Sequence, residues 1–387
     1  MPLAALIRDS CDPISVTIRR VDLDSRREVD RFIRFPFDLY RRDRLWVPPF
    51  IRDARAQLDR EQNPFFSHSR GDCFLAERDR EILGRIAVLW HRFYNERHHN
   101  DTAFFYFFDA VDSVEVAESL FDAARDWAAT RGLKRILGPI GFIQPDPPGV
   151  LVDGFEHPPA LNVPYNFPYY DGLLQGVGLD SHSEYVSGYI DRSYSLAPSI
   201  ERFADSLKDR NGYVVKSFSS RSEVIDWAPR VSDLYNEAFS EIDDYYPMRT
   251  DEFTTAVKRF VEVVDPKGVK LLLHKDRIIG FIFAFFDISH GLRQARGQLF
   301  PLGWYHLWRA FRTTEWGNIN GIGLLPEYQN SGANAILITE LTRSLLESQF
   351  KYFDLVQIKA ENLVSFGDME AIGVKWYKRH RVYRGEV

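Results

Sequence analysis

The chain has 387 residues, of which 45% are hydrophobic and 27% charged, and 49 Lys and Arg against 55 Asp and Glu give a formal charge of −6. This composition excludes disordered, collagen-like and coiled-coil classes. The acidic balance argues against a protein that holds nucleic acid by its overall charge, so no nucleic-acid partner is expected. The length favours two domains, and the 14% of aromatic residues favours a large apolar site or interface.

The sequence gives no sign of secretion or of a membrane span. The two cysteines, Cys11 and Cys73, lack the spacing of a disulfide framework, a metal site or a redox centre. The N-terminus lacks the basic region and cleavage site of a signal peptide. The longest apolar run, residues 278–286, is far shorter than the roughly 20 residues of a spanning helix. We therefore expect a cytoplasmic protein that at most lies against the inner face of the membrane.

Strand and helix patterns alternate through the first half of the chain. A strand is predicted over residues 14–21, and a helix over 28–42 that is interrupted near Pro36, because proline removes a helical hydrogen bond. Apolar stretches on either side of the charged turn 78–81 predict a β-hairpin. The further predicted elements are a strand at 103–110, a helix at 114–130, a strand at 134–137, a Pro- and Gly-rich loop at 138–168, a helix at 170–175 and a strand at 184–190.

The second half repeats this order of elements. The repetition predicts an α/β (α+β) fold of two tandem units, each a mixed and mostly antiparallel central sheet flanked by helices. We place the units at residues 14–192 and 193–387. The predicted elements of the second unit are a strand at 213–218, helices at 224–239 and 250–264, a hairpin at 269–274 and 278–287, a strand at 319–325, a helix at 335–349, a strand at 352–358, a short helix at 364–371 and a strand at 376–383.

One connection in the second half has the composition of an anion-binding loop. Between the strand at 319–325 and the next helix, the chain reads Pro-Glu-Tyr-Gln-Asn-Ser-Gly-Ala-Asn-Ala from Pro326. A strand, a loop of small residues and a helix N-terminus together present free backbone N–H groups and the positive end of the helix dipole. Such an arrangement binds phosphate or pyrophosphate groups.

The loop and its surroundings resemble the GNAT superfamily of acyl-CoA-dependent N-acyltransferases. The pattern Gln329-x-x-Gly332-x-Asn334 follows the strand, and Glu361-Asn362 follows the next strand. The resemblance implies that acyl-CoA or coenzyme A is the co-substrate and that no metal takes part. It also implies a set of residues that hold the cofactor: Leu324 and Leu325 along the pantetheine, Gln329, Asn330, Ser331, Gly332, Ala333 and Asn334 around the pyrophosphate, and Asn362 at the cofactor arm.

The cofactor loop and the first half both depart from the family pattern. Asn334 replaces the small residue that lets the phosphates approach, which is compatible with another thioester carrier such as an acyl carrier protein. The first half matches the family only in its order of elements, because the helix at 114–130 follows its strand with no glycine loop. We therefore expect the first half to be a degenerate copy that shapes the substrate side.

The implied reaction is aminolysis of a thioester, which needs a proton acceptor for the amine and an acid for the leaving thiolate. At the position where family members often carry an acidic tyrosine, this chain has Met369, and Tyr377 is the nearest substitute, although a structural tyrosine fits that strand as well. The candidate proton acceptors are Glu315, just before the cofactor strand, and then Asp243, Asp244 and Tyr245 in the loop between the two helices where this family usually binds the acceptor.

An insertion at residues 288–314 has no acidic residue at all. It contains four arginines, and its aromatic residues recur at helical spacing. This pattern is typical of a helix that lies in a membrane interface, held by anionic headgroups, and an amphipathic helix packed on the core has the same pattern. The arginines are Arg293, Arg296, Arg309 and Arg312, and the aromatic residues are Phe300, Trp304, Trp308 and Phe311.

Residues 161–171 and 299–304 are similar to segments of bacterial tandem-GNAT proteins, a group that includes ceramide synthases. This resemblance implies transfer of an acyl group from an acyl thioester to a primary amine, with a lipidic amine such as a sphingoid base as acceptor. Two alternatives stay open. One is a non-catalytic tandem GNAT protein that binds a lipid or a protein partner, and the other is an aminoacyl-tRNA-dependent transferase of related fold.

Overall fold

A computed structural model describes residues 15–191, 198–346, 348–361, 369 and 373–387. In each half, one short strand and several helices come before a long β-hairpin, and one long strand ends the half. The elements of the first half are β1 (Thr17–Arg20), α1 (Arg26–Leu39), α2 (Ile51–Leu58), the 3-10 helix η1 (Pro64–Ser67), β2 (Arg70–Arg78), β3 (Glu81–Trp90), α3 (Arg92–His98), β4 (Thr102–Ala110), α4 (Val114–Ala129), β5 (Arg135–Gly138), β6 (Val150–Asp153), α5 (Tyr170–Gly176) and β7 (Asp180–Asp191).

The second half follows the same plan with one insertion. The segment 288–314, for which one helix is predicted that is either interfacial or packed on the core, forms two helices, α9 and α10. The predicted short helix at 364–371 lies almost wholly outside the described residues. The elements are α6 (Pro198–Asn211), β8 (Tyr213–Ser217), α7 (Arg221–Ala238), α8 (Thr250–Phe260), β9 (Val264–His274), β10 (Arg277–Phe286), α9 (Ser289–Ala295), α10 (Gly303–Thr313), β11 (Trp316–Leu324), the 3-10 helix η2 (Pro326–Tyr328), α11 (Ala333–Leu346), β12 (Tyr352–Lys359) and β13 (Lys375–Glu386).

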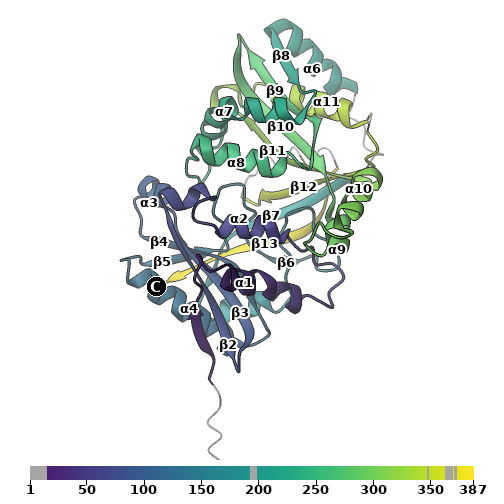
Figure 1. The fold of residues 1–387 in the computed structure, drawn as a ribbon. Helices are drawn as coiled ribbons and strands as arrows, with labels where there is room; N and C mark the ends of the chain where they lie inside the picture. Colours follow the sequence, from purple (N-terminus) through teal and green to yellow (C-terminus); the bar gives the residue numbers. More distant parts are fainter. Residues whose placement is uncertain (1–14, 192–197, 347, 362–368, 370–372) are drawn as a thin grey trace, which may run out of the picture.

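The described strands form one mixed sheet of 13 strands (Figure 1). Its order is β1-β2-β3-β4-β5-β13-β7-β12-β11-β10-β9-β8, and β6 pairs with β13. Neighbouring strands are antiparallel except for two parallel pairs, β4 with β5 and β11 with β12. The predicted fold class of two mixed, mostly antiparallel units flanked by helices is confirmed, and the two units share a continuous sheet.

The last strand of each half lies among the strands of the other half. β13 pairs with β5, and β7 pairs with β12, while β7 and β13 are neighbours along most of their length. Each half therefore completes the sheet of the other. The division at residues 192 and 193 follows the order of the chain and stays our proposal for the domains, but neither segment contains all the strands of one sheet.

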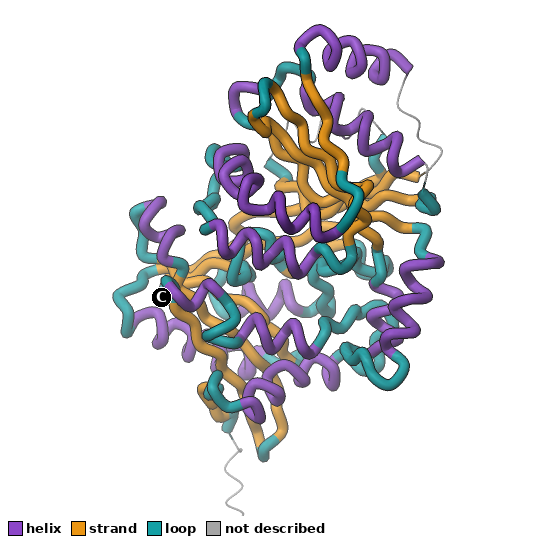
Figure 2. The backbone as a smooth tube through the Cα atoms, turned by 45° about the horizontal axis from the view of Figure 1, so that its top comes forward, coloured by secondary structure: helices purple, strands orange, loops and turns teal. Residues whose placement is uncertain are grey.

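Helices cover both faces of the sheet (Figure 2). In the first half, Phe105 packs against Phe121 of α4 with ring centres 5.1 Å apart, whereas its neighbour Phe104 belongs to the core formed with α1 and α2 on the opposite face. In the second half, Phe281 stacks on Tyr235 of α7, and the preceding residue, Gly280, lies against α11. The sheet is thus the middle layer of three.

Helix α1 continues through Pro36, so the predicted interruption is wrong. A proline at this position leaves the carbonyl of Phe32, four residues earlier, without its helical N–H partner. Arg85 Nη1 donates to this carbonyl at 3.0 Å, and the same guanidinium holds Asp109 with Nη2 to Oδ2 at 2.7 Å. A tertiary hydrogen bond therefore replaces the missing helical one.

Candidate active site

Strands β11 and β12 begin as neighbours and then diverge. They pair from Trp316 with Tyr352 to Ile319 with Leu355, although both strands continue for several residues beyond that pair. Each strand carries a bulge just past this point, β11 against β10 between residues 319 and 322 and β12 against β7 between 355 and 358. Because a bulge bends its strand, the two carboxyl ends turn apart, and their facing backbone edges are left for a ligand that runs between them.

The predicted cofactor loop lies at the end of β11, at the N-terminus of α11. Gln329 Nε2 donates to the carbonyl of Leu324 at 3.2 Å, and Ser331 Oγ donates to the carbonyl of Tyr328 at 2.6 Å. The structure thus brings the predicted residues of the cofactor site together in one turn, apart from Asn362, which lies outside the described residues. That set is Leu324, Leu325, Gln329, Asn330, Ser331, Gly332, Ala333 and Asn334.

Polar side chains of this loop occupy part of the helix N-terminus themselves. The N–H of Ala333 donates to Ser331 Oγ at 3.3 Å, and the N–H of Ala335 donates to Asn334 Oδ1 at 2.9 Å. Gly332 has a φ of +82°, and a Cβ atom there would come within 2.8 Å of the ring of Phe203 on α6. The turn therefore depends on glycine for its backbone conformation and for the close approach of α6.

In the first half, β4 pairs with β5 only as far as Phe104 and continues without β5 to Ala110, where its end is occupied by protein. Only residues 111–113 separate β4 from α4, compared with residues 325–332 between β11 and α11. Ser113 Oγ accepts the N–H of Val116 as an ordinary helix cap. The hydroxyl of Tyr169 donates to the carbonyl of Ala110 at 2.8 Å, and the N–H of Ala110 donates to the hydroxyl of Tyr170 at 3.2 Å. The described part of the first half therefore offers no counterpart of the loop in the second half.

A buried polar cluster lies where β11 and β12 begin to diverge. Asn318 and Asp354 are directly opposite each other, and Tyr189 of β7 is opposite Asp354, so these side chains share one face of the sheet. Tyr377 of β13 donates its hydroxyl hydrogen to Asp354 Oδ2. Asp354 is 2% exposed, and its Oδ1 atom has no hydrogen-bond partner among the described residues. Since an unpaired buried acceptor is unfavourable, this oxygen is a candidate for contact with a ligand.

Two further charged residues, Lys378 and Asp287, adjoin Asp354. Burial raises the pKa of Asp354 to about 7, and repulsion by Asp287 adds to the effect, while the hydrogen bond from Tyr377 and the charge of Lys378 oppose it. Burial lowers the pKa of Lys378 to about 8, against the attraction of both carboxylates. Burial and the adjacent Asp354 raise the pKa of Tyr377. The cluster thus holds an acid and an amine that titrate near neutral pH, as groups that transfer protons commonly do.

Sequence reasoning missed Asp354, Lys378 and Asp287. A usable signal existed for Asp354, because it is the single charged residue in the apolar segment Tyr-Phe-Asp-Leu-Val-Gln-Ile at 352–358, and an acidic residue in a buried strand is uncommon. The other two residues carried no such signal. Lys378 meets Asp354 because β13 lies beside β7 and β7 beside β12. Asp287 follows β10 and meets Asp354 from the other side, across β11.

Glu315 lies on the surface at the start of β11, at the opposite end of that strand from the cofactor loop. Its Oε1 atom is 2.5 Å from Lys351 Nζ, and its carbonyl accepts the backbone N–H groups of Lys351 and Tyr352. These contacts join the starts of the two parallel strands β11 and β12.

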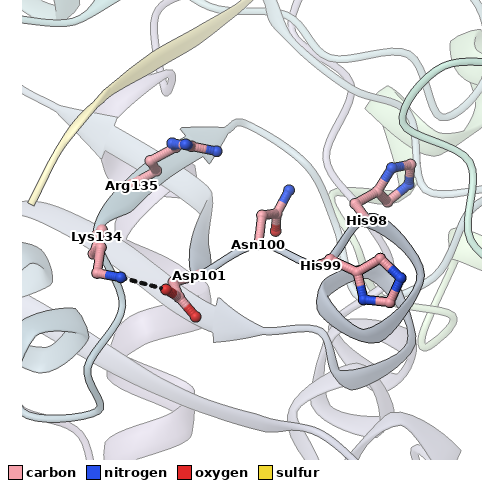
Figure 3. Close-up of a pocket in the computed structure, with 6 residues that line it drawn as sticks. All are labelled: His98, His99, Asn100, Asp101, Lys134 and Arg135. Carbon is pink, nitrogen blue, oxygen red and sulfur yellow. Dashed lines mark hydrogen bonds and ion pairs between the residues drawn. The ribbon is translucent and has the colours of Figure 1, made fainter.

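The first half repeats this arrangement at the starts of β4 and β5, beside a hollow of about 350 Å³ (Figure 3). Lys134 Nζ lies 2.8 Å from Asp101 Oδ2, and the carbonyl of Asp101 accepts the N–H groups of Lys134 and Arg135. The half that has no glycine loop therefore carries the same clamp as Glu315 and Lys351. A structural role explains both clamps, and we do not keep Glu315 as a proton acceptor in the proposal below.

The predicted residues between α7 and α8 have different surroundings from one another. Asp243 is exposed, whereas Tyr245 is buried and donates its hydroxyl hydrogen to Asn236 Oδ1 at 2.6 Å. Burial raises the pKa of Tyr245, which makes it a weak acid. Neither side chain contacts the cluster around Asp354 in any interaction of the described residues.

Asp244, between them, is held by three other elements. Its carboxylate lies 3.2 Å from the hydroxyl of Tyr94 on α3, 3.2 Å from His182 Nε2 on β7 and 3.4 Å from Lys359 Nζ on β12. Burial by itself raises the pKa of Asp244, but the hydrogen bond from His182 and the charge of Lys359 outweigh it and hold the value at about 2. Such a carboxylate is a poor base, and it ties the α7–α8 loop to both halves.

We expect Asp244→Asn to lower the free energy of unfolding at pH 7 by about 1–3 kcal/mol, because the folded state holds the pKa well below its ordinary value of 3.8. A lowered pKa contributes stability above pH about 4 that disappears as the pH falls towards 2. Urea unfolding of both proteins at several pH values should therefore show a difference that shrinks in acid. Asp243→Asn, one residue away and exposed, is the matched control, and an equal loss in that variant would contradict the interpretation.

The segment 161–171, singled out by its resemblance, has a structural place in the fold. Asn166 is buried and bonds both the N–H and the carbonyl of Leu151 on β6. The neighbouring loop covers β13, because the carbonyls of Pro158 and Pro164 accept from Lys378 Nζ and His380 Nε2. This loop therefore packs over one side of the cluster around Asp354.

No three His, Cys, Asp or Glu side chains lie close enough together in the described part of the chain to hold a metal ion. Over the same residues, every helix is too short or too polar to cross a bilayer.

Comparison with solved structures identifies the fold. The tandem GNAT protein from the clavulanic acid biosynthesis pathway superposes with a TM-score of 0.57 at 12% identity, over 96% of this chain and 98% of that chain. A GCN5-related glucosamine N-acetyltransferase region of a fungal multi-domain GH3 β-N-acetylglucosaminidase also gives a TM-score of 0.57, at 13% identity, over 98% of this chain and 39% of that one. The chain has the tandem GNAT fold.

Two curated proteins are similar in sequence over nearly their whole length. Protein YghO of Escherichia coli strain K12 is 24% identical over 373 residues, which is 94% of each chain. The bacterial ceramide synthase of Caulobacter vibrioides is 22% identical over 379 residues, 96% of this chain and 98% of that protein. No protein-family profile matches the chain.

Proposed function

We propose that the chain is an N-acyltransferase that moves an acyl group from an acyl thioester to a primary amine. The observation that carries the proposal is the divergence of β11 and β12 beside a loop that opens α11, with a buried, titratable cluster at the point of divergence. The similar protein named bacterial ceramide synthase supports a lipidic acceptor such as a sphingoid base.

The donor is acyl-CoA, held through its phosphates at the N-terminus of α11. The N–H of Ala333 bonds to Ser331, and that of Ala335 bonds to both Asn334 Oδ1 and the carbonyl of Gly332. A phosphate would replace the two side-chain caps with stronger, charge-assisted bonds. Leu324 and Leu325 end the strand along which the pantetheine would run. Asn362 stays in the proposal as a contact of the cofactor arm, and an acyl carrier protein is the alternative carrier of the thioester.

In the proposed reaction the amine nitrogen bonds to the thioester carbonyl carbon, the carbon–sulfur bond breaks, and an amide and a free thiol result. The carboxylate of Asp354 takes the proton from the attacking nitrogen and passes it to the departing sulfur. Tyr377 orients this carboxylate through its hydrogen bond. Its raised pKa suits this positioning role better than the role of acid that the sequence suggested.

The test is thiol release by the purified protein with acyl-CoAs from acetyl to stearoyl, each with and without a sphingoid base, and with mass spectrometry of the products. Amine-dependent release together with a new amide supports the proposal. If every donor is inert while the protein still binds the lipid amine, the non-catalytic alternative replaces it. Activity that requires charged tRNA would favour the other alternative, an aminoacyl-tRNA-dependent transferase.

Asn334→Asp is expected to weaken donor binding without lowering the stability of the fold. The new charge lies in the first turn of α11, where it interacts favourably with the helix dipole, so the free energy of unfolding should stay unchanged or rise by about 0.3–1 kcal/mol. The same charge repels a pyrophosphate, so KM for acyl-CoA should rise about tenfold or more. Ser113→Asp, at the N-cap of α4 in the half without the loop, is the matched control and should leave KM unchanged. An unchanged KM in Asn334→Asp would contradict the assignment of the loop.

A lipidic acceptor is most accessible to a cytoplasmic protein that lies against the inner face of the membrane. We include this localisation in the proposal, with residues 288–314 as the contact. The lack of acidic residues in that segment and its aromatic content support it.

A further inference from the structure

Exposed apolar side chains of the described residues are concentrated in one short segment. Of the nine large hydrophobic residues that are exposed, five lie between residues 300 and 308. Phe300, at 77%, is the most exposed of them. We call this set the aromatic face, and its members are Phe300, Leu302, Trp304, Tyr305 and Trp308.

The two sides of helix α10 have different surroundings. Leu307, Ala310 and Phe311 face inward and join the core around Phe285 of β10. Trp304 and Trp308 lie one turn apart on the opposite side and are each 53% exposed. Packing of the helix on the core therefore explains only the inner side of α10. Among the described residues, nothing covers the aromatic face.

Side chains of the aromatic face contact one another and the nearby backbone. Trp304 Nε1 donates to the carbonyl of Pro301 at 3.1 Å, and the ring of Tyr305 stacks on Trp308 with centres 6.1 Å apart. The guanidinium of Arg312 lies 5.8 Å from the centre of the Trp308 ring. These contacts hold large apolar groups in water without burying them, which is unfavourable unless another surface covers them.

Positive charge lies on the helices α9 and α10 and on the loop beside α9, and so comes from both halves of the chain. Arg309 and Arg312 are exposed on α10, and Arg296 is exposed at the end of α9. Arg293 Nη1 donates to the carbonyl of Arg44 at 2.6 Å, so the end of the loop that carries Arg41, Arg42 and Arg44 lies against α9. All three of these first-half arginines are exposed.

Acidic groups close to this basic surface are few. Residues 288–314 contain none, and in the loop the carboxylate of Asp43 is engaged by the N–H groups of Leu45 and Trp46 and by the hydroxyl of Tyr165. At the end of α10, Glu315 pairs with Lys351. The surface therefore has a strong excess of positive charge in a chain whose net charge is negative.

We propose that the aromatic face docks on an anionic lipid bilayer, with Phe300, Leu302 and Trp304 inserted at the headgroup boundary and the surrounding arginines on lipid phosphates. Tryptophan and tyrosine favour this boundary, and arginine clusters without carboxylates match an anionic surface. The docking surface explains why apolar and basic side chains occur together on the outer side of α10. It rests on the membrane contact included in the proposed function and specifies its residues and lipid charge, and lipid binding measures it separately from transferase activity.

The test is flotation of the full chain with vesicles of phosphatidylcholine alone and with phosphatidylglycerol added, at low and high salt. We expect binding to the anionic vesicles, a blue shift of tryptophan fluorescence, and weaker binding at high salt. Trp304→Ser with Trp308→Ser should lower the partition coefficient about tenfold or more. Arg309→Gln with Arg312→Gln should lower it about tenfold on anionic vesicles and leave binding to neutral vesicles unchanged.

Matched controls distinguish the aromatic face from general surface effects. Val114→Ser with Val214→Ser removes exposed apolar groups elsewhere, and Arg26→Gln with Arg27→Gln removes exposed charges on α1. Both pairs should bind as the unchanged protein does. The proposal is overturned if the unchanged protein ignores anionic vesicles at low salt, or if the test pairs bind as well as the controls. It is also overturned if the tryptophan pair abolishes a dimer, which would make a second copy of the chain the occupant.

Discussion

Asp354→Asn is expected to abolish most of the transferase activity and to make the protein more stable at neutral pH. Loss of a general base lowers kcat by about 10²–10⁴-fold, and KM for acyl-CoA should stay close to its original value because Asp354 lies away from the loop at the start of α11. Burial raises the pKa of this carboxyl to about 7, so only the ionised form at higher pH can accept a proton. We therefore expect kcat/KM of the unchanged protein to rise through pH about 7 and the variant to lack this rise.

The stability of the same variant should change in the opposite direction. A carboxyl whose pKa is raised above its ordinary value of 3.8 contributes stability below that value, and the contribution is lost as the pH rises through about 7. Replacing the carboxylate by an amide should raise the free energy of unfolding at pH 8 by about 1–3 kcal/mol and have little effect near pH 4. Urea unfolding at both pH values measures this.

Two variants control the experiment on Asp354. Tyr377→Phe removes the hydrogen bond that lowers the pKa of Asp354, so the rise of kcat/KM should move to higher pH with part of the activity retained. Glu315→Gln alters the surface clamp and should leave kcat unchanged. Full activity of Asp354→Asn, or a pH profile that Tyr377→Phe does not move, would exclude Asp354 as the proton acceptor.

The second large effect is expected when the chain is divided at the proposed domain boundary. Residues 1–192 and 193–387, produced separately, should each fail to show a cooperative thermal transition, because each lacks a strand of its sheet. Val382 and Tyr383 of β13 belong to the two cores of the first half, and Ile190 of β7 belongs to the core of the second. Loss of one buried aromatic side chain such as that of Tyr383 lowers the free energy of unfolding by about 3–5 kcal/mol, and each isolated half lacks a whole strand.

Mixing or co-producing the two halves should restore a complex with a cooperative transition, measured by circular dichroism and size-exclusion chromatography. The matched control is a chain opened in the exposed turn between β2 and β3, where the two strands pair locally and should stay together. A cooperative transition in either isolated half would contradict the exchange of β7 and β13.

The local pattern of the sequence determined the elements and the repeat. Alternating apolar residues in the hairpins at 73–90 and 269–287, and the strand, loop and helix order around Gly332, depend on neighbours in the chain, and the structure confirms the fold class that they predict. For the same reason the loop at 325–332 could be found, since its N–H groups belong to consecutive residues. The roles of its residues are still predictions.

Only the tertiary structure decided which residues from different elements contact one another. Pro36 stays within α1 because Arg85, far along the chain, bonds the carbonyl that the proline leaves free. Asp354, Tyr377 and Lys378 meet because β7 lies between β12 and β13, and the arginines at 41–44 adjoin α9 through a contact between the two halves. Strand partners and surface patches depend on contacts between residues that are not neighbours in the chain, and no periodicity in the sequence records such contacts.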